Sequence, residues 1–560
     1  MKPAAGAALA LLVLAAAPPA PNDLVARGKL GAIATVEPHA TAVGLEVLRG
    51  GGNAMDAAVA VFLTLAVTHP QAGNLGGGGF FLVRMHDGTT ACFDFREKAP
   101  ARAHRDLYLK ADGTVDDDKA RIGALAAGVP GSPAGLLAGL ARFGTRKLPE
   151  LAAPAIRLAR EGFVVDSFLA AALAAEAKDL GRFAATRKVF FKGERPLQQG
   201  EQLRQGDLAG TLERFAAGGF DGFYRGETAR LLTASMRESA GLITAEDLAA
   251  YTCVERTPLR GTYRGHEVIS MPPPSSGGIA LLQMLNLLEP HDLAASGFGS
   301  SRTIHLLTEA MRRAYADRAR WLGDPDFFKV PVAGLVSKEY AQQLHAGFDL
   351  ERTSEVAPGR PPGAPEGDHT THFSVVDAQG NAVSCTTTLN GTFGSCLVGE
   401  GAGFLLNNEM DDFSAKPGSP NMYGLVGGKA NQIEPGKRML SSMTPTIVLR
   451  EGRLRYVLGT PGGGRIMNTV LQVLLNLIDH KLPLETAVAA PRIHHQWKPE
   501  ELGYERLALS EDVRQRLVQM GHKLAAKPAT FCQVAAIEVR SDGMRVAVQD
   551  PRSGGSAAAY

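Results

Sequence analysis

Hydrophobic and polar positions along this 560-residue chain recur with two spacings, and each spacing predicts a different kind of element. Short runs in which apolar and polar residues alternate, bounded by glycine, proline or asparagine, predict β-strands. Longer apolar runs that follow a capping residue predict helices; Asn53, for example, precedes the alanine-rich run 54–67. We expect strands at 31–36, 80–85, 91–95, 445–450, 455–458 and 533–539, and helices at 39–48, 54–67 and 467–478.

A segment rich in proline and glycine, 355–368, divides this pattern into two parts. Before it, residues from about 123 to 310 have mainly helical spacing. Just after it, a turn at 377–381 (D-A-Q-G-N) separates two strand-like runs. Because strands lie on both sides of the segment, we expect the two parts to share one core. The whole pattern predicts a layered α+β body in which helices cover antiparallel-type strands.

The first 20 residues resemble a secretory signal peptide. Lys2 supplies the basic start, residues 4–17 are apolar, and small residues with prolines follow to Ala20. The apolar run is shorter than the ~20 residues that span a membrane comfortably. The alternative is an N-terminal anchor that stays uncleaved. Such a segment directs export and is removed from the mature chain, so we expect a bacterial periplasmic or secreted protein.

Charge and cysteine content narrow the class of partner. Fifty-nine basic residues balance 57 acidic ones, which gives no electrostatic reason to expect nucleic acid or stable membrane association and favours a small polar metabolite. The five cysteines (Cys92, Cys253, Cys385, Cys396, Cys532) are odd in number and lack metal-ligand spacing. We expect them to be small buried thiols. The sequence predicts neither a metal nor a cofactor.

Thr370 is the first candidate for chemistry, because it stands where the proline-rich segment meets a strand-like run (G-D-H-T-T-H-F-S-V-V-D, 367–377). A chain that cuts itself before a threonine places that hydroxyl beside a new α-amine, which can serve as its base. Paired threonines before a strand are usually only strand formers, so Thr370 and Thr371 do not decide the matter alone. The run 386–388 (T-T-T) follows on the partner strand, where a hydroxyl would face Thr370 or belong to a threonine ladder.

Further polar clusters would suit a ligand that carries both an amine and a carboxylate, although each alone is usually a solvated turn. Arg96 follows a strand and can hold a carboxylate with two parallel hydrogen bonds, and Ser441 and Ser442 add hydroxyl donors. The run 407–412 (N-N-E-M-D-D) supplies acceptors for an ammonium. The glycine turn 460–465 (T-P-G-G-G-R) enters a helix, where N–H groups suit a phosphate or a developing oxyanion, but it lacks the Gly-Lys-Ser/Thr of a P-loop.

The chain resembles the γ-glutamyltranspeptidase family in strings that occur in family order: GGNAMDAAVAV, HPQAGNLGGGGFFLVR, DFREKAP, SMPPPSSGGI, YADRARWLGDPDF, HTTHFSVVD, LLNNEMDDFSAKPG, YGLVGGKAN, LSSMTPTIV and TPGGGRI. They extend from about Gly31 to Arg552, close to the whole mature chain. The resemblance implies an Ntn-hydrolase αββα sandwich, in which two stacked antiparallel-type sheets are flanked by helices. It also implies a proenzyme that cuts itself before a nucleophilic threonine.

Carried over to this sequence, the resemblance places the cut between His369 and Thr370. It implies a heterodimer of a large subunit, 21–369, whose end is the proline-rich segment, and a small catalytic subunit, 370–560. Thr370 would attack the substrate with its own α-amine as general base, and Thr388 would hydrogen-bond this nucleophile.

The resemblance also assigns the remaining site residues. The amides of Gly462 and Gly463 would form the oxyanion hole. The substrate-binding positions are Arg96, Ser441 and Ser442 for the α-carboxylate, Asn390, Glu409 and Asp412 for the α-amine, and Tyr423 as a lid over the pocket. Two small departures occur, because Glu409 stands where some relatives have glutamine and Gly464 stands where some have serine.

The implied activity transfers a γ-glutamyl group from a donor such as glutathione to water, an amino acid or a dipeptide. One alternative keeps the fold but takes a glutaryl side chain of a β-lactam of the cephalosporin type, as an acylase. That substrate has no ammonium, so Glu409 and Asp412 would have no role in binding it. A second alternative is a non-enzymatic periplasmic protein that binds amino acids and stays uncut.

Overall fold

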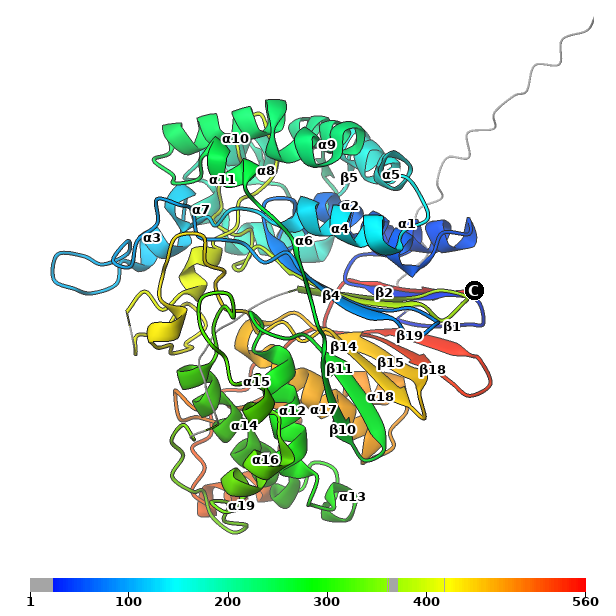
Figure 1. Cartoon of the computed structure of the whole chain (residues 1–560), viewed down its shortest axis with the longest axis vertical. Coiled ribbons are helices and arrows are strands. Elements are labelled where there is room, and N and C mark those ends of the chain that lie inside the picture. The colour runs from blue at the N-terminus through cyan, green and yellow to red at the C-terminus, as the bar shows by residue number, and fades with distance from the viewer. Residues whose placement is uncertain (1–23, 360, 362–370, 417) are drawn as a thin grey trace, which may run out of the picture.

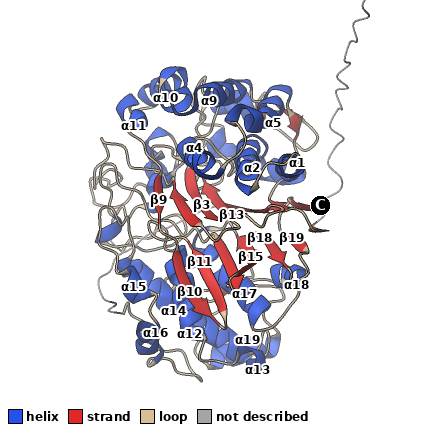
Figure 2. Cartoon of the chain, turned by 45° about the vertical axis from the view of Figure 1, so that its right-hand side comes forward, coloured by secondary structure: helices blue, strands red, loops and turns tan. Residues whose placement is uncertain are grey.

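Two seven-stranded antiparallel sheets lie face to face at the centre of the molecule (Figure 1). The computed structural model describes residues 24–359, 361, 371–416 and 418–560. Figure 2 shows the strands of both sheets between an upper and a lower group of helices, so the order of layers is αββα. The sandwich that the resemblance implies is therefore confirmed.

The sheets have the following strand orders. The lower sheet in Figure 1 contains β1 (Val25–Gly28), β19 (Arg545–Gln549), β18 (Ala535–Val539), β15 (Arg453–Gly459), β14 (Thr446–Arg450), β11 (His266–Ser270) and β10 (Leu259–Tyr263). The upper sheet contains β20 (Ser556–Ala559), β2 (Ala32–Thr35), β12 (Thr371–Val376), β13 (Ala382–Thr388), β3 (Gly78–Arg84), β4 (Thr90–Asp94) and β9 (Val254–Arg256).

Helices cover the outer face of each sheet (Figure 1). The main helices of the upper layer are α1 (Pro38–Arg49), α2 (Ala54–Thr68), α4 (Ser132–Phe143), α5 (Leu148–Glu161), α6 (Ser167–Ala175), α9 (Gly206–Tyr224) and α10 (Gly226–Glu238). Those of the lower layer are α12 (Gly277–Leu288), α14 (Ser301–Trp321), α16 (Lys338–His345), α17 (Ile466–Ile478), α18 (Leu484–Ala489) and α19 (Glu511–Gln519). None of the described helices is long and apolar enough to cross a membrane.

Apolar side chains fill the space between the sheets and the space under each helical layer. Between the sheets the core includes Ala34 and Phe80 of the upper sheet and Ile269 and Ile447 of the lower one. Helix α2 lies in the upper core with every residue buried, which explains why its sequence is apolar on all sides. Burial on both faces of each sheet thus holds the strand ends, where the candidate residues lie, in a rigid scaffold.

The two parts of the chain on either side of segment 355–368 both contribute strands to each sheet. Strand β2 lies between β20 and β12, and β3 pairs with β13. In the other sheet β1 pairs with β19 and β11 pairs with β14. The prediction that the two parts share one core is confirmed. Positions 1–20 and the junction of His369 with Thr370 lie outside the described residues.

Most predicted elements are found within two residues of their expected ends, but the helical interpretation of 123–310 was incomplete. Strands β9, β10 and β11 lie within it. Leu259 and Tyr263 are buried while Arg260 and Thr262 are exposed, so alternation was present but short and rich in charge. Strands β19 and β20 were also not predicted.

All five cysteines are free thiols; three are buried, and Cys253 and Cys532 are half-buried.

Candidate active site

A buried ion cluster surrounds Arg96, just after β4. Its side chain is fully buried; Nη1 donates a hydrogen bond to Glu409 Oε1, and Nη2 donates to Asp412 Oδ2 at 2.6 Å. Nε and Nη2 also donate to the carbonyl oxygens of Met439 and Leu440, both at 3.1 Å. The residue predicted to bind a carboxylate therefore contacts two of those predicted to bind an ammonium.

Burial dominates the electrostatics of this cluster. It would lower the pKa of Arg96, but the charges of Glu409 and Asp412 outweigh it and raise that pKa. Burial raises the pKa of Glu409 to about 7 and that of Asp412 well above its usual range, and Arg96 opposes both rises. A third carboxyl group, Glu97, lies 3.8 Å from Arg96 Nη1, and its pKa is also raised, by burial and by the charge of Glu409. One cation thus faces three acids that resist ionisation.

Several polar atoms at predicted positions are buried without a hydrogen-bond partner among the described residues. They are Asn390 Oδ1, Glu409 Oε2 and Ser442 Oγ. A buried polar atom left unpaired costs ~1–3 kcal/mol, so each calls for a partner. The first two are acceptors at positions predicted to hold an ammonium, and the third is a hydroxyl predicted to hold a carboxylate. Their chemistry matches the two charged groups of an α-amino acid.

The Ser441–Ser442 segment is held by the other part of the chain. Ser276 donates to the carbonyl oxygen of Ser441 through its N–H at 2.7 Å and its Oγ at 2.9 Å. Ser275 Oγ donates to the carbonyl oxygen of Met443 at 2.6 Å. The string SMPPPSSGGI therefore positions the string LSSMTPTIV, although the two are far apart in sequence.

A cleft of about 700 Å³ contains the other predicted residues in its lining: Thr388, Asn390, Tyr423, Gly462 and Gly463. Thr388 ends β13, and its Oγ1 accepts a hydrogen bond from the N–H of Asn390 at 2.6 Å. The cleft also opens along α6 and a loop near residues 530–533. It offers a route from solvent to the residues that the resemblance places around the reacting bond.

The hairpin of β12 and β13 sets the position of the candidate nucleophile's neighbours. Strand β12 begins at Thr371, which pairs with Thr387. The Thr386 hydroxyl contacts His372 Nδ1 at 3.0 Å, and Thr387 Oγ1 donates to the carbonyl oxygen of Gly78 at 2.8 Å. Thr388, one residue further, lies at the same end of the hairpin as the start of β12. Thr370 itself, like His369, lies outside the described residues.

The glycine turn after β15 needs its glycines. Gly462 has φ 128° and Gly463 has φ 60°, both in the region that disfavours other residues. A β-carbon at Gly462 would lie 2.4 Å from Cys532 Sγ, and one at Gly463 would lie 2.8 Å from a ring carbon of Tyr423. The turn leads through a short 3₁₀ turn, Gly463–Arg465, into α17. Backbone N–H groups at such a start have no acceptor within the helix and can stabilise an oxyanion.

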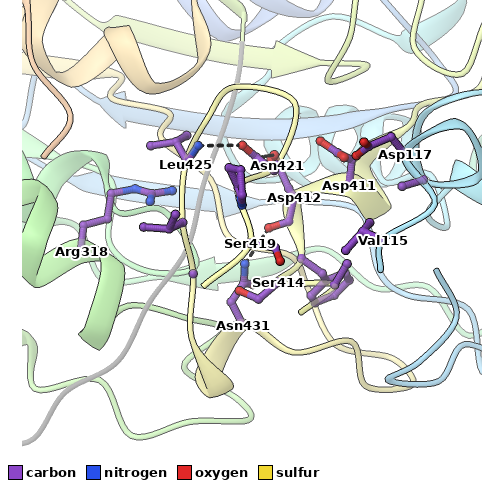
Figure 3. Close-up of a pocket in the computed structure, with 16 residues that line it drawn as sticks. Val115, Asp117, Arg318, Asp411, Asp412, Ser414, Ser419, Asn421, Leu425 and Asn431 are labelled. Atoms are coloured by element: carbon purple, nitrogen blue, oxygen red, sulfur yellow. Dashed lines mark hydrogen bonds between the residues drawn. The ribbon is translucent and has the colours of Figure 1, made fainter. Parts of the chain in front are cut away.

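Tyr423 lies over this turn as part of a tethered loop. Its hydroxyl donates to the carbonyl oxygen of Asn390 at 2.7 Å, and its N–H donates to Asn421 Oδ1 at 3.0 Å. Figure 3 shows Asn421 beside Asp412 at a narrow cavity of about 30 Å³, and Asn421 Nδ2 donates to Asp412 Oδ1 at 3.1 Å. One loop therefore connects the predicted lid to the ion cluster.

The sequence patterns do not single out Glu97, Arg465 or Phe531 as site residues. Glu97 adjoins Arg96 in sequence, and Arg465 directly follows the glycine turn, so a signal existed for both. Phe531 lies in a loop with no regular spacing, and only the fold brings it to the cleft.

Comparison with known proteins places these residues in context. The family model described as gamma-glutamyltranspeptidase matches residues 40–560. A glutathione hydrolase proenzyme of Escherichia coli is 49% identical over 96% of this chain and 95% of its own length. Among solved structures, a cephalosporin acylase from Bacillus halodurans is similar with a TM-score of 0.86 at 28% identity, covering 98% of this chain and 99% of that one. The γ-glutamyltranspeptidase of Helicobacter pylori is 43% identical with a TM-score of 0.57, covering 58% of this chain and 94% of that one.

Proposed function

This chain belongs to the γ-glutamyltranspeptidase family, and we propose that it is a self-processing enzyme that cleaves the γ-glutamyl amide bond of glutathione and similar compounds. The observation that carries the proposal is the buried cluster of Arg96, Glu409 and Asp412, together with the buried unpaired oxygens of Asn390 and Ser442. These groups complement the α-carboxylate and α-ammonium of a γ-glutamyl substrate.

Substrate binding is an exchange of ion pairs. The α-carboxylate takes the place of the internal acids on Arg96 and accepts hydrogen bonds from Ser441 and Ser442. The α-ammonium then donates to Glu409, Asp412 and Asn390. Because an unpaired buried charge is costly, both halves of the exchange are needed. Tyr423 covers the bound group.

The chemistry proceeds through an ester on Thr370. Its Oγ1 attacks the γ-carbonyl carbon while its α-amine takes the hydroxyl proton, and Thr388 hydrogen-bonds the nucleophile. The N–H groups of Gly462 and Gly463 stabilise the oxyanion. The C–N bond then breaks, and the leaving amine receives the proton from the α-amine. Water hydrolyses the ester, or the amine of an amino acid or dipeptide takes over the γ-glutamyl group.

Processing and export complete the proposal. Removal of the signal peptide, 1–20, and a cut between His369 and Thr370 give subunits 21–369 and 370–560, which stay together as a heterodimer in the periplasm or outside the cell. The word "proenzyme" in the name of the Escherichia coli relative supports a processed product. The pairing of strands from one part with strands from the other supports their continued association.

The acylase alternative has support from the Bacillus halodurans structure but conflicts with the charges of the site. A glutaryl group has a carboxylate and no ammonium, so Glu409 and Asp412 would remain buried without a cationic group from the substrate. We therefore expect turnover of γ-glutamyl-p-nitroanilide to exceed that of glutaryl-p-nitroanilide at equal concentration. Preference for the glutaryl compound would reverse the assignment of substrate.

Replacement of the nucleophile tests the proposal directly. Thr370→Ala removes the hydroxyl, so we expect one uncut chain near 59 kDa, less any signal peptide, with no release of p-nitroaniline. Thr392→Ala, at an exposed threonine of the same cleft, is the matched control and should give two fragments and normal turnover. Two fragments or activity in Thr370→Ala would sink the mechanism. Sequencing the small fragment of the unmodified protein should give a terminus at Thr370.

A further inference from the structure

Among the described residues that line the wide cleft, Arg465 is the single permanent cation. Its side chain is exposed, its N–H donates to the carbonyl oxygen of Gly462 at 3.2 Å, and its guanidinium lies 5.2 Å from the centroid of the Phe531 ring. No described carboxylate forms an ion pair with it, whereas a second arginine in the region, Arg552, is paired with Glu505 and Asp550. Arg465 is therefore held by an aromatic face and keeps its donors for another partner.

The other titratable groups of the cleft do not cancel this charge. Glu37 accepts hydrogen bonds from His39 and from the Thr68 hydroxyl, and the bond to Glu37 raises the pKa of His39. Burial lowers the pKa of His69 to about 4, so that ring is neutral near pH 7. Asp166 accepts the N–H of Leu169 as the cap of α6. Glu37 and Asp166 both act on the charge of His39, and neither forms an ion pair with Arg465 beside the glycine turn.

The position of Arg465 sets the size of a matching ligand. It lies two residues after Gly463 in the 3₁₀ turn Gly463–Arg465, so the two backbones are at most about 7 Å apart, and both residues line the cleft. An extended dipeptide has the same reach from its α-amine to its carboxylate. When the amine of a dipeptide lies at the acyl carbon, whose oxygen the glycine turn holds, the carboxylate of that dipeptide can therefore reach the guanidinium of Arg465.

We infer that Arg465 binds the terminal carboxylate of the amine partner, both the dipeptide that leaves glutathione and the dipeptide that accepts the γ-glutamyl group. This inference rests on the proposed function and names the second substrate of the same site. Arg465 is a specificity-determining residue, because a charge-assisted pair with a carboxylate distinguishes peptides with a free C-terminus from amines without one.

Two acceptors that differ only at the C-terminus test this role. With γ-glutamyl-p-nitroanilide as donor, we expect kcat/KM for glycylglycine to exceed that for glycylglycinamide about tenfold or more in the unmodified protein. In Arg465→Gln the ratio should fall close to one, and in Arg465→Lys it should be intermediate, because lysine keeps the charge without the fork of donors. Arg237→Gln, at an exposed arginine of α10, is the control and should keep the original ratio.

Because the ratio is taken within one variant, a general change in rate cancels. An unmodified protein that transfers equally well to both acceptors would overturn the inference, even if neither Arg465 variant folds. A ratio that is unchanged in Arg465→Gln would also overturn it. A protein that releases no p-nitroaniline at all would instead contradict the proposed function, so the two failures are distinct.

Discussion

Glu409 is subject to two opposing requirements. Burial holds its pKa near 7, which favours the neutral acid, while a bound ammonium requires the carboxylate. Arg96 offsets part of this conflict by donating to its Oε1. A glutamine at this position, as in some relatives of the family, would keep the hydrogen bonding and abolish the titration. Under the proposed binding mode, the charge of this residue makes amino-acid binding depend on pH.

Binding of L-glutamate should reveal this dependence. Since the ammonium binds the ionised form, and the raised pKa leaves Glu409 protonated below about 7, affinity should increase as pH rises from 6 to 8. The limit for one proton is about tenfold per pH unit. In Glu409→Gln the slope should become smaller, and the remainder belongs to Asp412, whose pKa burial also raises. Calorimetric titration of L-glutamate into both proteins measures it, and equal slopes would show that another group titrates.

Two neighbouring glycines should respond differently to a methyl group. Gly462→Ala combines φ 128° with a β-carbon 2.4 Å from Cys532 Sγ, so we expect the turn to be displaced and turnover to fall about 100-fold, the loss typical of an oxyanion donor. At Gly464 the nearest atom is 3.2 Å away, at the end of the flexible Gln496 side chain, so Gly464→Ala should retain most activity. The rate of p-nitroaniline release by each variant measures this difference. Equal losses of rate in the two variants would contradict this account.

At the scale of elements, Asp377 joins a hairpin to a helix. Its Oδ1 accepts the N–H groups of Gln379 and Asn381 at 3.0 Å, and its Oδ2 accepts the N–H of Ala54 at 3.0 Å. The turn between β12 and β13 is thereby attached to the first turn of α2, across the proposed cut. A carboxylate at a helix N-terminus is also favoured by the helix dipole.

Asp377→Ala should therefore destabilise the protein without touching the cleft. Loss of these bonds costs about 2–4 kcal/mol, which for a chain of this length lowers Tm by roughly 2–4 °C. Asp112→Ala, in an exposed loop where the carboxylate bonds only Thr114, should shift Tm by less than about 1 °C. Thermal unfolding followed by circular dichroism compares them. Equal shifts would mean that the hairpin and α2 are not coupled through Asp377.

Helices and strands were predictable where the pattern of apolar residues was regular over a long run of sequence. Helix α2 follows a capping residue and is apolar throughout, so its bounds were nearly right. Strand β10 was hidden because Arg260 and Thr262 occupy its exposed face, and β11 was hidden because it is short and buried within a region of helical spacing. The resemblance located Arg96, Glu409 and Asp412, but their mutual contact depends on how the end of β4 meets a 3₁₀ turn far away in sequence. Such a contact is a property of the fold and has no local pattern.

At the scale of the whole molecule, both parts of the chain contribute strands to each sheet, and strands of one part pair with strands of the other. Separating them would break the pairs β2–β12, β2–β20, β3–β13, β1–β19 and β11–β14. It would also expose the core between the sheets, which both parts build.

The processed enzyme should accordingly behave as one particle. We expect a single peak of about the full mass in gel filtration under native conditions, and two fragments only in denaturant. Salt at 1 M should not separate them, because the contact is mainly apolar and paired backbone. Dissociation into two folded fragments on dilution would contradict this expectation.

The pairing of strands from both parts of the chain also bears on when the proposed cut can occur. Strand β12, which starts one residue after the proposed cut, has β2 from the early part of the chain on one side and β13 on the other. The neighbours of the proposed cut are assembled only when both parts of the chain have joined the upper sheet, so the proposed cleavage would follow folding. If the chain is cut as proposed, a free threonine forms only on a folded chain, and a misfolded chain keeps its peptide bond and stays inactive. Under the proposed function, catalytic activity would therefore also report that the chain has folded correctly.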